Sequence, residues 1–383
     1  MQLVAYGAQD AFLTGDPDIT FFKIVYRRHT NFAMESIRQT FSGNSTWGNR
    51  ATATISRNGD LIKNCYIEAK LPKLKEGMKY VNSIGHKLIK EVELEIGGQL
   101  IDRQYGEWLE IWSELTLPEG KYNGYGDMIG RSYDETIESV YVPLQFFFCR
   151  HPGLALPLIA MQYHEVKLSF TFSEINDCIE YKSKVEDRDI GNINVMLWVD
   201  YIYLDTDERR RFAQTKHNML IEQIQYNGGT TMDTIDLTFN HPCKELIWVI
   251  QGDKYKTNGF NFSCQSDENK YNLTQGGPLK SAMLKLNGHD RFEERNGAYF
   301  KLVQPYQHHT RIPSQYIYSY SFALHPEEQQ PSGSCNFSRI DNARLMLKKE
   351  DLVKKANPQT KVFAINYNVL RIQSGMAGLA FSN

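Results

Sequence analysis

Strict alternation of apolar and polar side chains is the feature of this sequence that most constrains its fold. In residues 87–96, apolar side chains at 88, 92, 94 and 96 alternate with charged side chains at 87, 91, 93 and 95. A period of two places successive side chains on opposite faces of a strand. The same period occurs at 166–172 and 193–203, and again in the second half of the chain at 282–286 and 343–347. We therefore predict a chain built mostly of half-buried strands.

Signals for turns and helices are fewer. Asn58-Gly59 separates two short apolar stretches, and because both residues tolerate positive φ the pair predicts a β-hairpin. Residues 105–115 place apolar side chains at helical spacing and predict one short amphipathic helix. Asp205 or Thr206, followed by acidic residues, predicts the start of another helix midway along the chain. We interpret this second helix as a linker between two β-domains.

Two short motifs recur in the second half of the chain. The first motif and its repeat, 174 positions later, are His151, Pro152 and Pro157, and then His325, Pro326 and Pro331. Residues 95–98 recur as 285–288, at a spacing of 190. The two spacings differ by 16, so the first copy carries a net insertion of 16 residues, for which the Gly- and Tyr-rich residues 118–130 are the natural place. Two copies of a strand-rich unit suit two antiparallel sandwiches with long loops.

This repeat divides the chain into four parts. We predict an N-terminal arm at 1–25, a first sandwich at 26–205, a linker helix at 206–220 and a second sandwich at 221–383. The fold class is all-β with a few short helices. If the two halves are equivalent, the His-Pro loops are expected at the same end of each sandwich, with Pro157 matching Pro331.

The composition argues against nucleic-acid coating. The chain has 43 Lys+Arg against 45 Asp+Glu, a net charge of −2, whereas proteins that coat nucleic acid neutralise phosphates with a cationic excess. The 6 Cys residues are dispersed and contain no CxxC pair, which favours free thiols in a reducing compartment. We therefore expect no direct nucleic-acid partner.

No catalytic, metal or cofactor site is predicted. The sequence lacks the GxxxxGK[ST], GxSxG and HExxH motifs. His308-His309 is the pair considered for a metal, but adjacent side chains on a strand point to opposite faces, so we expect no metal there. Without a nucleophile, base and oxyanion donor, the chain is predicted not to be an enzyme.

The segment 19–32 interleaves bulky aromatic side chains with a basic cluster. Its candidate contact residues are Phe21, Phe22, Tyr26, Arg27 and Arg28. From the residues alone, the segment is either an arm that docks on a partner or an anionic surface, or a first strand with a basic rim.

Several long blocks of this sequence are specific enough to indicate a family. The blocks include LTGDPDITFFKIVYRRHTNFAMESI, IGGQLIDRQYGEWLEIWSELT, CRHPGLALPLIAMQYHEVKL, YLDTDERRRFAQ and NFSRIDNARLML. Together with QLVAYGAQD and ISRNGDLI, they resemble the major capsid protein of nucleocytoplasmic large DNA viruses over nearly the whole chain.

The resemblance implies a double jelly roll, with two eight-stranded antiparallel sandwiches in each chain. It also implies that three chains form a pseudo-hexagonal capsomer, and that capsomers tile the icosahedral shell of a virion over an internal lipid membrane. Such viruses assemble in the host cytoplasm. The implied partners are other copies of the chain, minor capsid and penton proteins, and the membrane. The arm would then face the particle interior, with Phe21, Phe22 and Tyr26 as apolar anchors and Arg27 and Arg28 meeting acidic proteins or lipid head groups.

Two alternatives to a major capsid protein remain open at this stage. A minor capsid or scaffold paralogue on the same fold would differ in its copy number per particle. A carbohydrate-binding or enzymatic jelly roll would display an aromatic-lined cleft or a cluster of His and carboxylate side chains.

Overall fold

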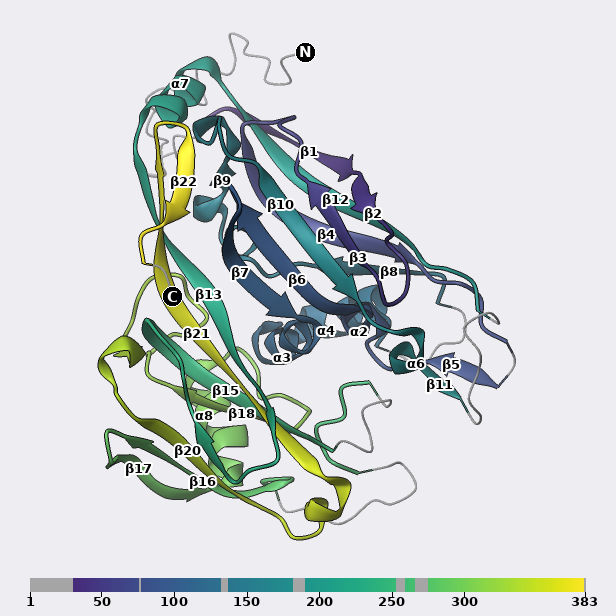
Figure 1. The fold of residues 1–383 in the computed structure, drawn as a ribbon, viewed down its shortest axis with the longest axis vertical. Coiled ribbons are helices and arrows are strands. Elements are labelled where there is room, and N and C mark those ends of the chain that lie inside the picture. The colour runs from purple at the N-terminus through teal and green to yellow at the C-terminus, as the bar shows by residue number, and fades with distance from the viewer. Residues whose placement is uncertain are drawn as a thin grey trace, which may run out of the picture.

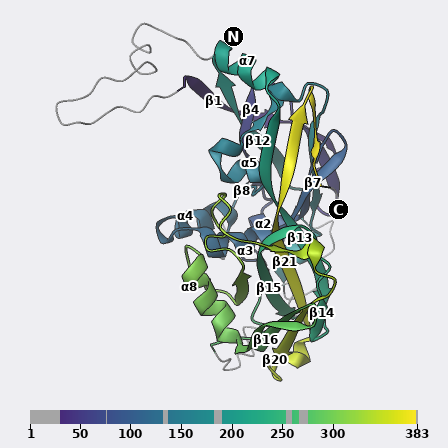
Figure 2. The same cartoon turned by 90° about the vertical axis from the view of Figure 1, so that its left-hand side faces the viewer.

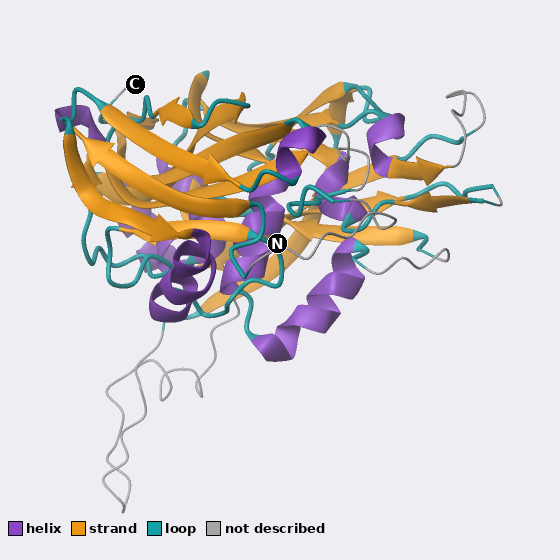
Figure 3. Cartoon of the chain, turned by 90° about the horizontal axis from the view of Figure 1, so that it is seen from below, coloured by secondary structure: helices purple, strands orange, loops and turns teal. Residues whose placement is uncertain are grey.

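Strands dominate the chain, and its helices are short (Figure 1, Figure 3). The computed structural model describes residues 30–75, 77–131, 137–181, 190–252, 259–265 and 275–381. The strands form two sandwiches, the first jelly roll (residues 32–204) and the second jelly roll (residues 217–379), so the predicted double jelly roll is confirmed. The candidate arm residues lie outside the described residues; they are Phe21, Phe22, Tyr26, Arg27 and Arg28.

Two antiparallel sheets face each other in the first jelly roll. The β1 sheet has the strand order β1 (Phe32–Gln39), β12 (Asn194–Leu204), β4 (Leu61–Lys70) and β8 (Ser139–Pro143), with β9 (Leu156–Pro157) paired to β4. The β3 sheet has the order β2 (Phe41–Gly43), β3 (Arg50–Thr54), β10 (Val166–Phe172), β6 (Ile89–Ile96) and β7 (Gln99–Tyr105). A separate ribbon pairs β5 (Met78–Tyr80) with β11 (Ile179–Tyr181). The connections hold α2 (Ile84–Leu88), α3 (Gly106–Thr116), α4 (Glu119–Ile129), α5 (Phe147–Arg150), η1 (Pro152–Leu154), η2 (Leu158–Ala160) and α6 (Ile175–Cys178).

The second jelly roll is built in the same way. The β13 sheet has the order β13 (His217–Thr230), β21 (Pro358–Gln373), β15 (Pro242–Gly252) and β18 (Ile317–Ser321), with β19 (Cys335–Asn336) paired to β15 and β22 (Met376–Leu379) to β21. The β14 sheet has the order β14 (Thr234–Asp236), β20 (Ala343–Lys349), β16 (Leu279–Leu286) and β17 (His289–Asn296). Its connections hold η5 (Tyr299–Val303), α8 (Gln304–His308), η6 (Phe337–Arg339) and η7 (Val353–Ala356). None of the helices in the described part of the chain is long and apolar enough to cross a membrane.

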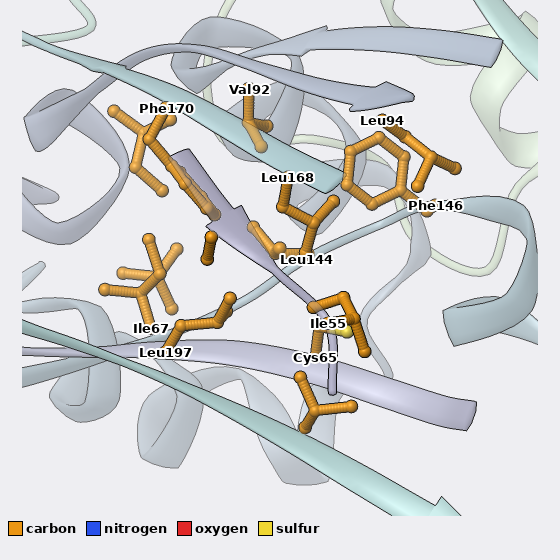
Figure 4. Packing of buried hydrophobic residues seen from close by; sticks show 14 of the residues in the cluster. Ile55, Cys65, Ile67, Val92, Leu94, Leu144, Phe146, Leu168, Phe170 and Leu197 are labelled. Atoms are coloured by element: carbon orange, nitrogen blue, oxygen red, sulfur yellow. The ribbon is translucent and has the colours of Figure 1, made fainter. Parts of the chain in front are cut away.

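The core of the first jelly roll is made by the alternating positions that the sequence singled out. Val92 and Leu94 from β6 and Leu168 from β10 point into the space between the two sheets (Figure 4). Ile67 and Leu197 meet them from the β1 sheet, and all five side chains are fully buried. Because a strand's inward side chains recur every second residue, the pattern of period two is the pattern of this core.

The two jelly rolls correspond strand for strand. In sheet order, β1, β12, β4 and β8 match β13, β21, β15 and β18, while β3, β10, β6 and β7 match β14, β20, β16 and β17. A β-bulge gives the match at residue level, because the pairing of β12 with β4 slips at Lys63 and the pairing of β21 with β15 slips at Lys244. Matching the bulges pairs the residues of β4 and β15 at a spacing of 181 and those of β12 and β21 at a spacing of 165.

The repeated hairpin and the insertion are both present. Gly97-Gly98 joins β6 to β7 with φ of 58° and 80°, and Asn287-Gly288 joins β16 to β17 with φ of 50° and 80°. Only residues that tolerate the left-handed region fit such turns. The insertion in the first copy is α4, a helix. Residues 297–316, which join β17 to β18 and are all described, contain η5 and α8 and no counterpart of α4.

The predicted hairpin at Asn58-Gly59 is wrong. The flanking strands β3 and β4 belong to different sheets, so the segment crosses from one sheet to the other. Gly59 is needed there for a different reason, since a Cβ atom would lie 2.8 Å from the Cβ of Tyr201. The long-range pairing of β3 with β10 and of β4 with β12 outweighs the local turn signal.

The His-Pro motifs lie in the same connection of each jelly roll. His151-Pro152 falls between β8 and β9, and His325-Pro326 falls between β18 and β19. Pro157, however, lies in β9 opposite Leu61, whereas the equivalent position in β19, opposite Pro242, is Asn336. Pro331 precedes β19, because the second loop is longer before its strand begins. The strand register therefore does not match Pro157 with Pro331.

The linker helix α7 (Thr206–Gln214) has the predicted N-terminal cap. The Asp205 carboxylate accepts a hydrogen bond from the backbone N–H of Glu208 at 3.0 Å. The helix ends at Gln214, and β13 begins at His217, within the range 206–220 that the sequence assigned to the linker. In Figure 1 this helix lies at one end of the molecule, where the chain passes from β12 to β13.

Candidate functional site: the junction between the two jelly rolls

Helix α3 lies where the two jelly rolls meet (Figure 2). The helix predicted at 105–115 is confirmed as Gly106–Thr116. A Cβ atom at Gly106 would lie 2.2 Å from the carbonyl oxygens of His86 and Ile89, so only glycine lets the chain turn from β7 into α3. Leu109 packs into the core of the first jelly roll. The side chains that α3 directs at the second jelly roll are Trp108, Ile111, Trp112 and Leu115.

These side chains cover the outward face of the β13 sheet. The covered residues, none more than 8% exposed, are Ile224, Ile247, Val249, Ile317, Phe363 and Ile365. The ring centroids of Trp108 and Phe363 are 5.6 Å apart. Burial of this apolar face holds the two jelly rolls together, because each would otherwise expose it to water.

Ion pairs cross the junction beside this apolar contact. Arg311 of the second jelly roll approaches the carboxylate of Glu114 on α3 at 2.9 Å, and the Ser314 hydroxyl donates to the same carboxylate at 2.8 Å. Arg150 approaches Glu222 at 2.7 Å in the opposite sense, from the first jelly roll to the second. The paired charges are buried or nearly so, and such pairs fix geometry more than they add stability.

The network extends into the first jelly roll through Glu110, which is fully buried. Its carboxylate lies 2.6 Å from Nδ1 of His86 and accepts a hydrogen bond from Gln315 of the second jelly roll at 3.0 Å. Burial alone raises the pKa of Glu110, but the hydrogen bond and charge of His86, with Arg131, outweigh burial and hold this pKa below its usual value. Glu110 therefore stays ionised inside the junction.

Lys244, the bulge residue of β15, is buried against Glu222. Burial lowers the pKa of Lys244, and the Glu222 carboxylate opposes that effect. Lys361 pairs with Glu107 at the start of α3, which adds a third ion pair across the junction. The two jelly rolls are thus fastened at several points around α3.

Asp102 at the end of β7 fastens the backbone of the second jelly roll. One of its carboxylate oxygens accepts a hydrogen bond from the N–H of Ile224 at 3.0 Å, and the other accepts one from Gln104 at 2.9 Å. Burial raises the pKa of Asp102 to about 6, although these hydrogen bonds lower it in part. The strand β7 of the first jelly roll therefore lies against β13 of the second.

His309 is buried within the second jelly roll and is not part of a strand, contrary to expectation. It follows the end of α8, because Pro305 begins a helical turn there. One ring nitrogen lies 2.6 Å from Glu245 and the other lies 2.9 Å from Glu327. The carboxylates flank opposite edges of the ring and do not converge on a common point. Within the described residues, no three His, Cys, Asp or Glu side chains gather as metal ligands would.

The ionisation of His309 predicts a pH-dependent stability. Burial alone lowers its pKa, but the charges and hydrogen bonds of Glu245 and Glu327 raise it to about 9, from 6.5 in the unfolded chain. The folded state therefore holds an extra proton between these pH values. We expect the free energy of unfolding to fall by roughly 3 kcal/mol as the pH rises from 6.5 to 9.

Urea unfolding at several pH values checks this expectation. The stabilisation is fully present below pH 6.5 and is lost as the pH rises through 9. In the variant His309→Gln the slope across this window should disappear. An unchanged slope in the variant would show that other groups cause it.

The junction also brings the two His-Pro loops toward each other. His151 and Arg150 line one side of a cleft of about 430 Å³, and residues 327–330, just after His325-Pro326, line the other. Glu222 lies at the same cleft. The sequence singled out these loops as repeat landmarks, and the ion pairs around them were not predicted.

Comparison with known proteins places the chain in a family. Residues 20–205 match the family described as "Major capsid protein N-terminus", and residues 208–378 match "Large eukaryotic DNA virus major capsid protein". The major capsid protein of Pyramimonas orientalis virus is 49% identical and covers 100% of this chain and 99% of its own length. That of Paramecium bursaria Chlorella virus 1 is 43% identical with the same coverage.

Solved structures agree with the sequence relatives. PBCV-1 VP54 superposes with a TM-score of 0.83 at 39% identity, covering 95% of this chain and 100% of that chain. The Faustovirus major capsid protein, at 11% identity, shares the fold with a TM-score of 0.72 over 91% of this chain and 92% of that one.

The paired jelly rolls and their fixed junction define a double jelly-roll capsid protein. The chain belongs to the major capsid protein family of large eukaryotic DNA viruses. It is a structural component of the virion and not an enzyme, and it assembles into a capsid with copies of itself.

Proposed function

We propose that the chain forms a homotrimeric capsomer of pseudo-hexagonal outline, which tiles the icosahedral shell of a large DNA virus over an internal membrane. The observation that carries this proposal is the strand-for-strand match of the two jelly rolls, including the bulges at Lys63 and Lys244. Three chains with two similar jelly rolls each supply six similar units around one axis, and a ring of six tiles a surface hexagonally. In this arrangement, residues 26–205 and 221–383 form alternate units of the ring, joined by residues 206–220.

The ring requires the two jelly rolls of a chain to keep a fixed angle. The buried junction around α3 supports this requirement, because its apolar contact and its ion pairs together specify one geometry. A major capsid role, as opposed to that of a minor paralogue, is favoured by the 49% identity to a named major capsid protein.

Native mass spectrometry of the purified full chain tests the capsomer. The chain mass is 44.3 kDa, so three copies give about 133 kDa. A dominant trimer at micromolar concentration supports the proposal, and monomers alone across a wide concentration range would refute it.

We also propose that the arm, residues 1–25, faces the particle interior. Phe21, Phe22 and Tyr26 would anchor it by apolar contact, while Arg27 and Arg28 would meet acidic minor capsid or penton proteins or lipid head groups. Assembly in the host cytoplasm suits the six cysteines, which are all free thiols. The near-neutral chain is not expected to contact the genome directly.

A truncation tests the arm. Deleting residues 1–20 should leave the trimer intact, because the described jelly rolls form their cores without these residues. Shell assembly or the attachment of minor proteins should fail, as judged by electron microscopy of particles and by their protein content. Normal particles from the truncated chain would show that the arm has no such role.

A further inference from the structure

One face of a sheet is covered in the second jelly roll and uncovered in the first. Helix α3 covers the outward face of the β13 sheet, as described above. The matched bulges and strand pairings identify the same positions on the β1 sheet. The covered residues Ile224, Ile247, Val249, Ile317, Phe363 and Ile365 correspond to Ser36, Tyr66, Glu68, Tyr141, Trp198 and Asp200. We call the latter set the open face.

The open face is accessible in the single chain. Ser36 and Tyr141 are exposed, Tyr141 to 40%, and the other four side chains are half-buried. Tyr66 and Trp198 stack with their ring planes 11° apart, and the Trp198 indole N–H donates to Glu68 at 2.8 Å. The open face is therefore a preformed aromatic surface with polar residues at its edge.

The second jelly roll carries a matching counterpart of α3. Gly297, like Gly106, follows the last strand of its sheet and leaves no room for a side chain, since a Cβ atom would lie 2.0 Å from the carbonyl oxygen of Leu279. The chain then enters η5 and α8. Phe300 is buried in its own core, as Leu109 is in the first. The positions after Gly297 are thus equivalent to the start of α3.

The outer side of this counterpart is also uncovered. Val303 is 39% exposed and Tyr306 is 77% exposed. Tyr299, in the place of Trp108, is half-buried. In Figure 2, α8 lies at the outside of the molecule, whereas α3 lies between the jelly rolls. The chain therefore has one helix face without a sheet and one sheet face without a helix.

We propose that η5 and α8 of one copy dock on the open face of a second copy. This inference rests on the homotrimer proposed above and names the surfaces that build it. Each chain offers the helix face once and the open face once, so the contact is head-to-tail and closes into a ring. In the ring, three contacts between chains repeat the three contacts that α3 makes within chains.

The chemistry of the two sheet faces fits this difference in use. The face covered within the chain is purely apolar and never meets water after folding. The open face must stay soluble until a second copy arrives, and it combines Tyr and Trp rings with Glu68 and Asp200. Tyr and Trp are enriched at the centres of protein interfaces, where they supply rigid contact area. The counterpart of the contact between Trp108 and Phe363 is a contact of Tyr299 with Trp198 of the neighbouring copy.

A matched pair of charge substitutions tests the contact. Tyr306→Asp places a charge in the proposed interface, and Met232→Asp places the same charge on a turn that is also exposed, at 69%. A subunit leaving a closed trimer breaks two such contacts. We expect Tyr306→Asp to raise the concentration for half-dissociation about 100-fold, while Met232→Asp changes it less than about threefold. Sedimentation velocity over a dilution series measures both values.

A photo-cross-link identifies the partner surface. A benzophenone-bearing amino acid at position 306 should capture a peptide of residues 61–70, 139–143 or 194–204 from another chain. Trimers that resist Tyr306→Asp, with cross-links to other segments, would overturn this inference and leave the homotrimer standing. A wild-type chain that forms no trimer at any concentration would overturn both.

Discussion

Replacing Trp108 by alanine should lower the free energy of unfolding by about 3 to 5 kcal/mol. The side chain is fully buried between the two jelly rolls, and its ring packs against Phe363. Its removal leaves a cavity that neither jelly roll can close alone, because α3 and the β13 sheet belong to different cores. We also expect the single unfolding transition in urea to separate into two, one for each jelly roll. Trp108→Phe should recover part of the loss.

Trp47→Ala is the matched control for this prediction. Trp47 is half-buried at the edge of the first jelly roll, where its indole N–H donates to the carbonyl of Gly191. The same substitution there should cost about 1 kcal/mol and leave the transition unsplit. Equal losses at the two positions would mean that the junction around α3 does not couple the jelly rolls.

Replacing Glu114 by alanine should cost a similar amount, about 3 to 5 kcal/mol. Glu114 is fully buried and approaches Arg311 at 2.9 Å and Arg131 at 3.3 Å. Its removal leaves two guanidinium groups near the interior without their counter-charge, and an unpaired buried charge is strongly destabilising. Glu114→Gln keeps the shape and a hydrogen bond to Ser314 but removes the charge, so its effect should be intermediate.

A surface pair provides the contrast. Asp351 pairs with Lys354 at 2.7 Å, but its side chain is 92% exposed. Asp351→Ala should leave the urea midpoint unchanged, because solvent screens exposed pairs. If Glu114→Ala were equally silent, the buried network would have no part in holding the jelly rolls together.

Much of the fold could be predicted from periodicity. Strands β6, β10, β12, β16 and β20 all fall where the side chains alternate, because one face of each strand is buried. The helix α3 and the cap at Asp205 were also predicted, since their signals are local. The hairpins at 97–98 and 287–288 follow from the residue types that positive φ requires.

Other features depend on contacts between distant residues and could not be predicted. The turn signal at Asn58-Gly59 says nothing of which sheet each flanking strand joins. Glu110 and Glu114, four residues apart on α3, read as the polar side of an amphipathic helix, yet both are fully buried. Only the approach of the second jelly roll, with Arg311, turns that polar side into an interior.

The repeat itself was visible only in part. Equivalent positions such as Ile224 and Ser36, or Phe363 and Trp198, carry different residue types, because one face is covered within the chain and the other is not. Sequence similarity between the halves therefore survives at turns and glycines, where backbone geometry is shared, and is lost on the faces that meet different surroundings.

The most direct test of the account is an image of the purified oligomer, obtained by single-particle electron microscopy and viewed along its symmetry axis. The account predicts three chains that present six similar jelly rolls in one ring, with neighbouring jelly rolls related by a rotation near 60°. In that ring, α3 and the pair of η5 and α8 should alternate at the six contacts. A particle with two-fold symmetry, or a ring in which the two jelly rolls of a chain are not neighbours related in this way, would contradict it.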